Sequence, residues 1–357
     1  MNQHNNTQKA SGSLFGLALG DALGARTEFL TFEAILRAYP PAGPQEPPGN
    51  PMRVTDDTQM ALAVGEALLQ APRPYTANGL EGPLRKTFID WYHSPDNNRA
   101  PGITCLTACQ QLERGMPWQQ ATVAHSKGCG ANMRVAPVGL LPVDAVTATT
   151  RAAIAQFQAA LTHGHPIALA ASDLTAFTIA NLAAGGDPAT LLRCLRDYAQ
   201  SQRTVYHIAW LGSLWQQATT SATQKGRLLR LPVEVSSPEE FIAYGWDGCL
   251  HILDRLDAAL RLADRESDPC LATGDGWIAE EAFATGLLCF LLFPHDAPAA
   301  IRRAAATRGD SDSIACLTGA FAGAYLGLDA WPASWRERIE YRERLMRLGT
   351  AWDTPSS

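Results

Sequence analysis

The sequence lacks the cysteine patterns that mark a disulfide scaffold or a zinc site. Its eight cysteines are scattered over 357 residues, without a CxxC pair and without the density of a small secreted domain. The opening segment MNQHNNTQKASGS also lacks the charged and apolar regions of a signal peptide. We therefore expect a reduced, cytoplasmic protein.

Long basic runs and long apolar runs are missing too. No block of Lys or Arg exceeds two residues and the formal net charge is −6, which argues against a protein that binds nucleic-acid backbones. The longest apolar segment, residues 282–293, is too short to cross a bilayer and is expected to be a buried helix. A membrane is therefore not an expected partner, and nucleic acid is a poor one.

The apolar residues recur mostly at spacings of three and four, and no convincing series of alternating strand residues is present, so the sequence predicts an all-α fold. The expected helices are residues 12–24, 58–70, 81–93, 103–114, 117–125, 147–163, 166–184, 188–200, 249–265, 278–292, 297–307 and 312–327. The proline-rich residues 40–51 predict a surface loop, and residues 220–247 predict a second irregular region. No low-complexity linker divides the chain, which favours a single domain.

Glycine recurs at every fourth position in two of the expected helices. The two rows are Gly16, Gly20 and Gly24 near the N-terminus, and Gly319, Gly323 and Gly327 near the C-terminus. Each glycine inside a helix costs about 1 kcal/mol relative to alanine, so the rows need a packing reason. A helix face without side chains lets another backbone approach closely. We therefore expect the two helices to be central neighbours, with Asp21 and Glu28 brought to the acidic start of the second helix.

Two similar polar clusters stand at helix starts, one at Thr55, Asp56 and Asp57 and the other at residues 310–313. Taken singly, each cluster has a structural explanation, because such residues cap helices and complement the helix dipole. Together they form an all-oxygen donor set, which suits Mg²⁺ or Mn²⁺ better than zinc. Crowded carboxylates without a cation would also have raised pKa values. The two clusters predict a site for two divalent cations.

A third segment, HSKGCGANMRVAPVGLLP at residues 125–142, contains Gly128 and Gly130. They permit a tight turn whose free N–H groups could bind a phosphate, although a simple turn between helices is the more common reason for such glycines. Arg134 could neutralise a phosphate or pair with an acid. His163, at the end of an expected helix, could cap that helix or contact a substrate.

Six motifs in a fixed order resemble the ADP-ribosylglycohydrolase family, which includes the dinitrogenase reductase-activating glycohydrolases and the ADP-ribosyl-acceptor hydrolases. The motifs are GLALGDALGARTEF, VTDDTQMAL, KGCGANMRVAPVGL, THGHP, GDGWIAEEAFA and RGDSDSIACLTGAFAGAYLG. The resemblance covers about residues 12–328. It implies an all-α, single-domain orthogonal helical bundle around a central binuclear metal site, with two Mg²⁺ or Mn²⁺ ions. The expected divisions are a flexible N-terminal segment at 1–11, the glycohydrolase domain at 12–330 and a C-terminal extension at 331–357.

The resemblance also implies roles for individual residues. The expected metal ligands are Thr55, Asp56, Asp57, Asp310, Asp312 and Ser313. The expected catalytic residues are Glu28, Asp57 and Asp310. The expected substrate-binding residues are Gly128, Cys129, Gly130, Ala131, Asn132, Met133, His163, Gly274, Asp275, Gly276 and Trp277.

The function that the resemblance implies is hydrolysis of the bond between ADP-ribose and an acceptor, by attack of water at the distal ribose C1″. ADP-ribosylarginine on a protein is the leading substrate hypothesis, with ADP-ribose as the product ligand. A serine linkage, a modified nucleobase, a free ADP-ribose metabolite, and a binding role such as immunity against an ADP-ribosylating toxin stay open as alternatives. The complete set of oxygen donors favours an enzyme over a silent binding protein.

Four positions depart from the family's usual pattern. The family's GGDTDT is RGDSDS here, so serines replace threonines at 311 and 313 and keep the ligand oxygen, while Arg308 replaces a glycine and could pair with Asp310 or contact the substrate. Cys129 stands where many relatives have Asn, so contacts at that position are expected to come from the backbone.

Overall fold

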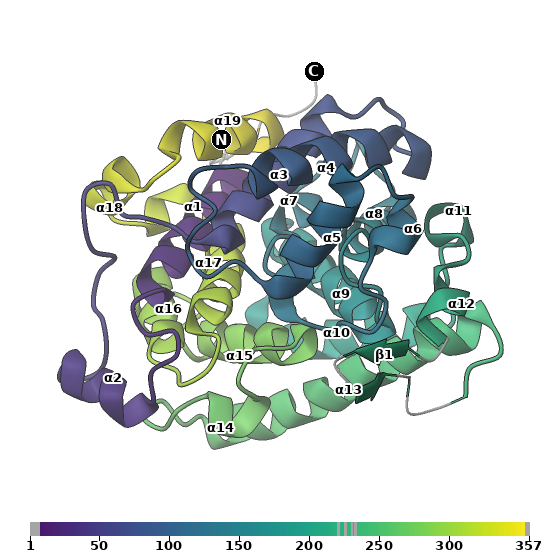
Figure 1. Ribbon diagram of the computed structural model, residues 1–357. Helices are drawn as coiled ribbons and strands as arrows, with labels where there is room; N and C mark the ends of the chain where they lie inside the picture. Colours follow the sequence, from purple (N-terminus) through teal and green to yellow (C-terminus); the bar gives the residue numbers. More distant parts are fainter. Residues whose placement is uncertain (1–7, 220–221, 225–226, 230, 232–233, 354–357) are drawn as a thin grey trace, which may run out of the picture.

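Helices make up nearly all of the regular structure. The computed structural model describes residues 8–219, 222–224, 227–229, 231 and 234–353, and these form nineteen α-helices, two 3₁₀ turns and one short hairpin (Figure 1). The all-α class predicted from the sequence is confirmed. The helices are α1 (Lys9–Gly24), α2 (Phe32–Ala38), α3 (Asp56–Gln70), α4 (Ala77–Tyr92), α5 (Ile103–Glu113), α6 (Trp118–Ala121), α7 (Ala136–Gly139), α8 (Ala148–Ala160), α9 (Pro166–Ala183), α10 (Pro188–Gln202), α11 (Ile208–Leu211), α12 (Leu214–Thr219), α13 (Pro238–Leu262), α14 (Cys270–Thr273), α15 (Ala279–Leu292), α16 (Ala297–Ala305), α17 (Ser311–Leu326), α18 (Ala333–Arg338) and α19 (Arg342–Asp353), with the 3₁₀ turns η1 (Cys129–Ala131) and η2 (Leu328–Ala330).

The expected helices are present, with shifted ends. The helix expected at 117–125 is only the short α6, and α8 is shorter than the expected 147–163. Helix α1 begins at Lys9, so residues 9–11 are helical and the flexible N-terminal segment does not include them; residues 1–7 lie outside the described part. The short helices α2 and α18 were not predicted because they are too short to display a helical repeat. The twelve-residue helix α19 was not predicted either.

The prediction of an irregular region at 220–247 is wrong for residues 238–247, which form the first part of α13. Its start carries the usual signals, because the Ser237 side chain accepts a hydrogen bond from the Glu240 N–H and Pro238 occupies the first turn. Before it, β1 (Ala222–Gln224) and β2 (Arg227–Leu229) pair antiparallel, with Ala222 opposite Leu229. The proline-rich residues 40–51 form a loop between α2 and α3, as predicted.

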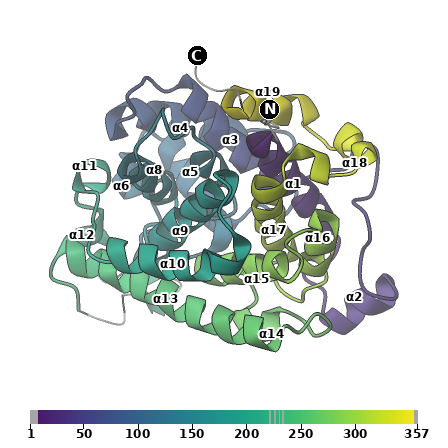
Figure 2. The same ribbon diagram turned by 180° about the vertical axis from the view of Figure 1, so that it is seen from behind.

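The two glycine-rich helices pack against each other, as the sequence predicted. Helices α1 and α17 run antiparallel and lie side by side in both ribbon views (Figures 1 and 2). A Cβ atom added at Gly16 would lie 2.1 Å from the carbonyl oxygen of Gly319, and one at Gly20 would lie 2.0 Å from that of Ala315. At the far end of the pair, a Cβ at Gly24 would meet the Ser311 carbonyl oxygen at 2.3 Å. The backbones therefore touch along the whole contact.

The C-terminal segment holds the N-terminal end of α1. In α19, the carboxylate of Asp353 accepts hydrogen bonds from the backbone N–H groups of Ala10 and Ser11 at the start of α1. Before α19, the Met52 N–H donates to the Arg338 carbonyl and the Glu340 N–H donates to the Met52 carbonyl. These two bonds hold the chain that leads into α3. The division between a domain at 12–330 and a C-terminal extension stays a prediction, but the extension packs on the site-forming helices.

One helix, α9, is long and apolar enough to span a membrane by length and composition. Of its apolar window, 78% is buried among the other helices, which is usual for the core helix of a globular protein.

The glycine contact generates a stability prediction. Gly20→Ala would place its methyl carbon 2.0 Å from the Ala315 carbonyl oxygen. Because this overlap forces the two helices apart, we expect the free energy of unfolding to fall by about 2 kcal/mol or more. The matched control is Gly82→Ala in α4, where an added Cβ meets nothing within 4 Å. It should change the free energy of unfolding by less than about 1 kcal/mol, because the gain in helix propensity is opposed by the restriction on a residue that precedes a proline, here Pro83. Urea unfolding measures both, and equal effects of the two changes would contradict the close backbone contact.

Candidate functional site

The α1–α17 contact brings the chain after α1 to the start of α17. Ser311 Oγ donates a hydrogen bond to the Gly24 carbonyl at 2.9 Å, and Thr27 Oγ1 donates to Ser311 Oγ at 3.0 Å. Ser311 therefore joins the two helices. Glu28, four residues beyond the end of α1, lies beside the acidic start of α17.

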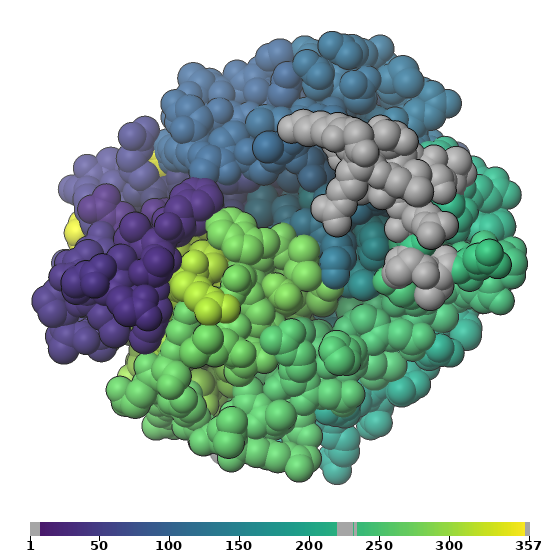
Figure 3. All heavy atoms as spheres, turned by 60° about the horizontal axis from the view of Figure 1, so that its bottom comes forward, coloured from purple at the N-terminus to yellow at the C-terminus, as the bar shows by residue number. Residues whose placement is uncertain are grey.

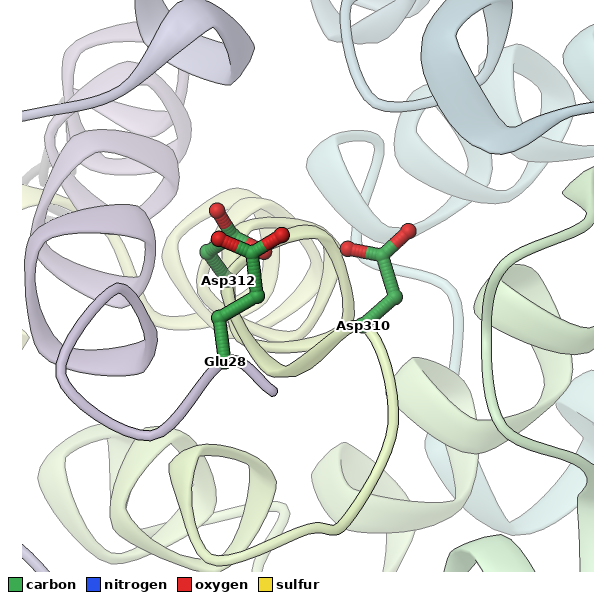
Figure 4. A group of neighbouring side chains, drawn as sticks. All are labelled: Glu28, Asp310 and Asp312. Carbon is green, nitrogen blue, oxygen red and sulfur yellow. The ribbon is translucent and has the colours of Figure 1, made fainter. Parts of the chain in front are cut away.

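Three carboxyl groups gather at that start. Glu28, Asp310 and Asp312 each offer an oxygen, and these oxygens lie within 4.8 Å of one another (Figure 4). Asp312 lies in the first turn of α17, while Asp310 precedes the helix and donates its backbone N–H to the Asp275 carbonyl at 2.7 Å. The cluster comes from two segments that lie 282 residues apart in sequence, at 28 and 310, and that are joined by the packing of α1 on α17 and by the hydrogen bonds of Ser311.

The start of α3 is held by Asp21, which was expected near the acidic cluster but not as a metal ligand or catalytic residue. The buried Asp21 of α1 accepts hydrogen bonds from the Thr55 N–H at 3.0 Å and from the Thr55 hydroxyl at 2.8 Å. It also accepts the Thr58 N–H at 3.1 Å. Asp21 therefore binds the N-terminus of α3 and sets Asp56 and Asp57 against the α17 cluster. Thr55 itself lies toward a neighbouring cavity.

The buried acids have strongly raised pKa values. Burial, with the charge of Asp312 as the next cause, raises the pKa of Glu28 to about 9, that of Asp56 to about 8 and that of Asp21 to about 7. The same two causes raise the pKa of Asp57 and of Asp310 well above the ordinary value. Without added positive charge, several of these groups would hold protons near neutral pH.

This donor set fits a hard divalent cation. The available atoms are carboxylate and hydroxyl oxygens, which Mg²⁺ and Mn²⁺ prefer. The Oδ1 atom of Asp57 is buried and makes no hydrogen bond to any described residue. A cation there would satisfy that oxygen and offset the mutual repulsion of the acids.

The acids face a cavity of about 400 Å³. The space-filling view shows a hollow between blue residues above and green residues below, beside purple N-terminal residues (Figure 3). The predicted site residues that line this cavity are Glu28, Asp56, Asp57, Gly128, Cys129, Gly130, Met133, His163, Trp277, Asp310, Asp312 and Ser313. The structure thus brings all three predicted groups, acids, glycine segment and Trp277, around one space.

The remaining predicted substrate-binding residues are not among those that line the cavity. They are Ala131, Asn132, Gly274, Asp275 and Gly276. The Asn132 side chain donates to the Ala279 carbonyl at 3.0 Å, and the Cys129 N–H donates to the Trp277 carbonyl at 3.1 Å. These bonds join the segment at 128–133 to residues 277–279, at the end of the loop at 274–277 and the start of α15. Gly276, at φ +84°, lets that loop pass close to Asp310.

Two charged side chains have different partners from those considered in the sequence. Arg308 pairs with Asp275 at 2.9 Å and approaches Asp268 at 3.9 Å, rather than pairing with Asp310. Arg134 is fully buried, donates to the Gln158 side chain at 2.8 Å and lies over the Phe88 ring. Among the described residues it forms no ion pair with an acid, and its burial keeps it from the cavity.

His163 lies directly under the glycine segment. A Cβ atom at Gly130 would lie 3.1 Å from the imidazole Cε1 atom, so the ring packs against the turn. Burial and the charge of Arg134 hold the pKa of His163 well below its usual value, and Nδ1 is hydrogen-bonded to Thr162 Oγ1 at 2.7 Å. His163 is a neutral part of the cavity wall.

Some residues of the cavity were not predicted from the sequence. Phe29 is 68% exposed and stacks on Trp277, which is 44% exposed, with ring centroids 5.6 Å apart. Residues 100–105 form another wall, and the Gly102 N–H donates to Asp56 at 3.3 Å. Neither feature has a distinctive sequence signal. The adjacency of Phe29 to Glu28 was the one available hint.

Comparisons with known proteins agree with this architecture. The family model described as ADP-ribosylglycohydrolase matches residues 2–354. An uncharacterised protein of Archaeoglobus fulgidus is 32% identical over 177 residues, which are 48% of this chain and 55% of that protein. The match therefore spans about half the length of that relative. The protein named ADP-ribosylarginine hydrolase Tri1 of Serratia proteamaculans is 26% identical over 362 residues, covering 95% of this chain and 77% of the relative.

A solved structure titled ADP-ribosylglycohydrolase-related protein complex is similar in fold. Its TM-score is 0.66, and the match covers 98% of this chain and 99% of the other at 23% sequence identity.

The raised pKa values predict how stability changes with pH. Between about pH 4 and pH 9 the folded protein holds protons on these acids that the unfolded chain releases, so stability falls as pH rises. We expect the melting temperature of the metal-free protein to fall from pH 6 to pH 9, through the pKa values of Asp21, Asp56 and Glu28. Added Mg²⁺ or Mn²⁺ should raise it more at pH 9 than at pH 6, because the carboxylates are then ionised.

Asp56→Asn removes one of these acids and should reduce the pH dependence, whereas Asp254→Asn on the exposed face of α13 should not. A melting temperature independent of pH and of both cations in the unmodified protein would rule out the cation site.

Proposed function

The chain belongs to the ADP-ribosylglycohydrolase family, and on that premise we propose that it is a metal-dependent hydrolase that releases ADP-ribose from ADP-ribosylarginine on a protein. The observation that carries the proposal is the cavity of about 400 Å³ that joins the acidic cluster to the glycine segment and Trp277. The arginine linkage is supported by the name of the Serratia relative, an ADP-ribosylarginine hydrolase.

The cavity offers distinct places for the parts of the substrate. Gly128 and Gly130 line the cavity, where main-chain groups would contact a diphosphate, and the missing side chain of Gly130 leaves room for His163 and Cys105. Trp277, stacked on Phe29, provides an aromatic surface at the cavity. The distal ribose would then lie over the carboxylates, with the scissile C1″ bond next to Glu28. Backbone bonds from residues 127 and 129 to residues 277–279 keep these parts in place.

The proposed ligands of the cations are Asp56, Asp57, Asp310, Asp312 and Ser313, with Thr55 as a further oxygen at the start of α3. Two divalent cations held by this set would offset the mutual repulsion of the acids and polarise the ribose hydroxyls and water. The buried, unpartnered Oδ1 of Asp57 supports a ligand role for this residue.

Glu28 is the proposed general base. It lies at the edge of the cavity, half-buried, and it must be ionised to accept a proton from water. That water attacks C1″ as the bond from C1″ to the guanidine nitrogen breaks, and the released nitrogen takes up a proton. Positive charge develops on the ribose ring during this step, and the carboxylates of Asp57 and Asp310 stabilise it. The products are ADP-ribose and unmodified arginine.

The proposal predicts metal-dependent release of ADP-ribose. An arginine-ADP-ribosylated protein should lose its label in the presence of Mg²⁺ or Mn²⁺ and keep it in EDTA. Serine-linked and nucleobase-linked substrates, assayed in parallel, should react at least about tenfold more slowly, since the leaving group and its contacts differ. Faster release from another linkage would replace the arginine assignment and leave the hydrolase in place. No release from any linkage would instead favour a binding protein.

Single substitutions test the roles of the acids. Asp56→Ala and Asp310→Ala should each lower kcat/KM at least about a hundredfold, because a site for two cations needs its complete ligand set. The control Asp254→Ala changes an exposed acid on α13 and should retain full activity. Circular dichroism should show the same helix content in all three variants. Near-normal turnover by both site variants would contradict the cation assignment.

A further inference from the structure

A second cavity lies on the other side of Glu28. It measures about 600 Å³, and Glu28 and Ala100 line both spaces, so the two cavities are neighbours. Its walls come from the C-terminal end of α1, the proline-rich loop at 48–51 and the chain at 53–55 that leads into α3. We call it the arginine pocket because Arg26, Arg53 and Arg99 line it.

Two of these arginines have no partner among the described residues. Arg26 and Arg53 are exposed and make neither an ion pair nor a side-chain hydrogen bond there. Arg99 differs, because its guanidinium donates to Glu340 at 2.6 Å and also binds the Val54 carbonyl. Arg99 is therefore a structural residue, whereas Arg26 and Arg53 are free to bind a ligand.

The proline-rich loop forms a fixed wall of the pocket. Arg302 donates to the Gln45 carbonyl at 2.7 Å, and Arg338 donates to the Gly49 carbonyl at 3.3 Å. The loop is thus held by α16 on one side and by α18 on the other. A wall already in place loses little conformational entropy when a ligand binds.

The charge in the pocket contrasts with the charge around it. The chain has a net charge of −6, and the neighbouring cavity is lined by acids. An acidic segment of an acceptor protein would be repelled by that surface unless it met local positive charge. Among the described residues, Glu28 is the one acid that lines the arginine pocket. Guanidinium groups bind carboxylates in a planar, two-point geometry, so Arg26 and Arg53 suit Asp or Glu side chains.

We propose that the arginine pocket binds the acceptor protein, through acidic residues that flank the modified side chain. The inference rests on the proposed function, in which ADP-ribose occupies the first cavity. The bond to be cut then lies beside Glu28, and the acceptor extends past Glu28 into the second cavity. Arg26 and Arg53 are specificity residues in this arrangement and do not contact the reacting atoms.

The test uses two ADP-ribosylarginine peptides of equal length, one with Asp and Glu flanking the modified residue and one with Lys. At low salt, the unmodified enzyme should cleave the acidic peptide with a kcat/KM about tenfold higher than that for the Lys-flanked peptide. This is the size expected when Arg26 and Arg53 each form one ion pair with the peptide in a partly enclosed pocket. The preference should shrink at high salt. In the double variant Arg26→Gln, Arg53→Gln it should fall close to one, mainly through KM.

The matched control is the double variant Arg37→Gln, Arg114→Gln. It removes the same charge from exposed positions outside both cavities and should keep the preference. The double variant Arg26→Gln, Arg53→Gln is called the pocket variant below. Calorimetric titration with ADP-ribose alone should give equal affinity for the unmodified enzyme and for the pocket variant. If ADP-ribose instead binds about tenfold more weakly to the pocket variant, the pocket holds the diphosphate and the acceptor assignment is overturned.

Failure of the proposed function would be recognised separately. If no peptide loses ADP-ribose, binding of the unmodified acidic peptide to the unmodified protein and to the pocket variant still tests the pocket. Weaker binding to the pocket variant alone supports the inference. Equal binding to both proteins, or equal cleavage of the two ADP-ribosylated peptides by the unmodified enzyme, overturns it.

Discussion

The rest of the structure depends on the direct backbone contact between α1 and α17. Glycine on both faces lets a carbonyl oxygen of one helix occupy the place where the other would carry a Cβ atom. Since the helices are antiparallel, the end of α1 meets the start of α17, and Glu28 reaches Asp310 and Asp312. A wider helix spacing would separate these acids.

Around that contact the protein concentrates negative charge in a buried place, which is unfavourable without a counter-charge. Asp21 offsets part of the cost by accepting N–H and hydroxyl hydrogen bonds at the start of α3. Asp57 keeps an oxygen with no described partner, and Glu28 and Asp56 carry raised pKa values. The fold therefore holds the acids in an arrangement that a divalent cation would stabilise.

Charge of the opposite sign lies just beyond Glu28. The proline-rich loop, which in the sequence indicated only a surface turn, forms a wall of the pocket that contains Arg26 and Arg53. Residues 338–340 reach back to this region and to the chain before α3. The C-terminal extension thus supports the site although none of its residues lines the first cavity.

The sequence by itself determined the helical class, the two glycine-rich helix faces and the acidic residues at the helix starts, because helical periodicity, glycine spacing and capping patterns are local properties. The pairing of the glycine rows could be expected only because both helices carry the same unusual face, and the tertiary structure supplied the contact itself. It did not reveal the Phe29–Trp277 stack, the wall at residues 100–105 or the partner of Arg308. It also missed the start of α13, although Ser237 and Pro238 are local signals for it. The stack, the wall, the partner of Arg308 and the arginine pocket were decided by the tertiary structure alone, because each joins segments far apart in the chain, and no periodicity in a single segment specifies which distant surface it will meet.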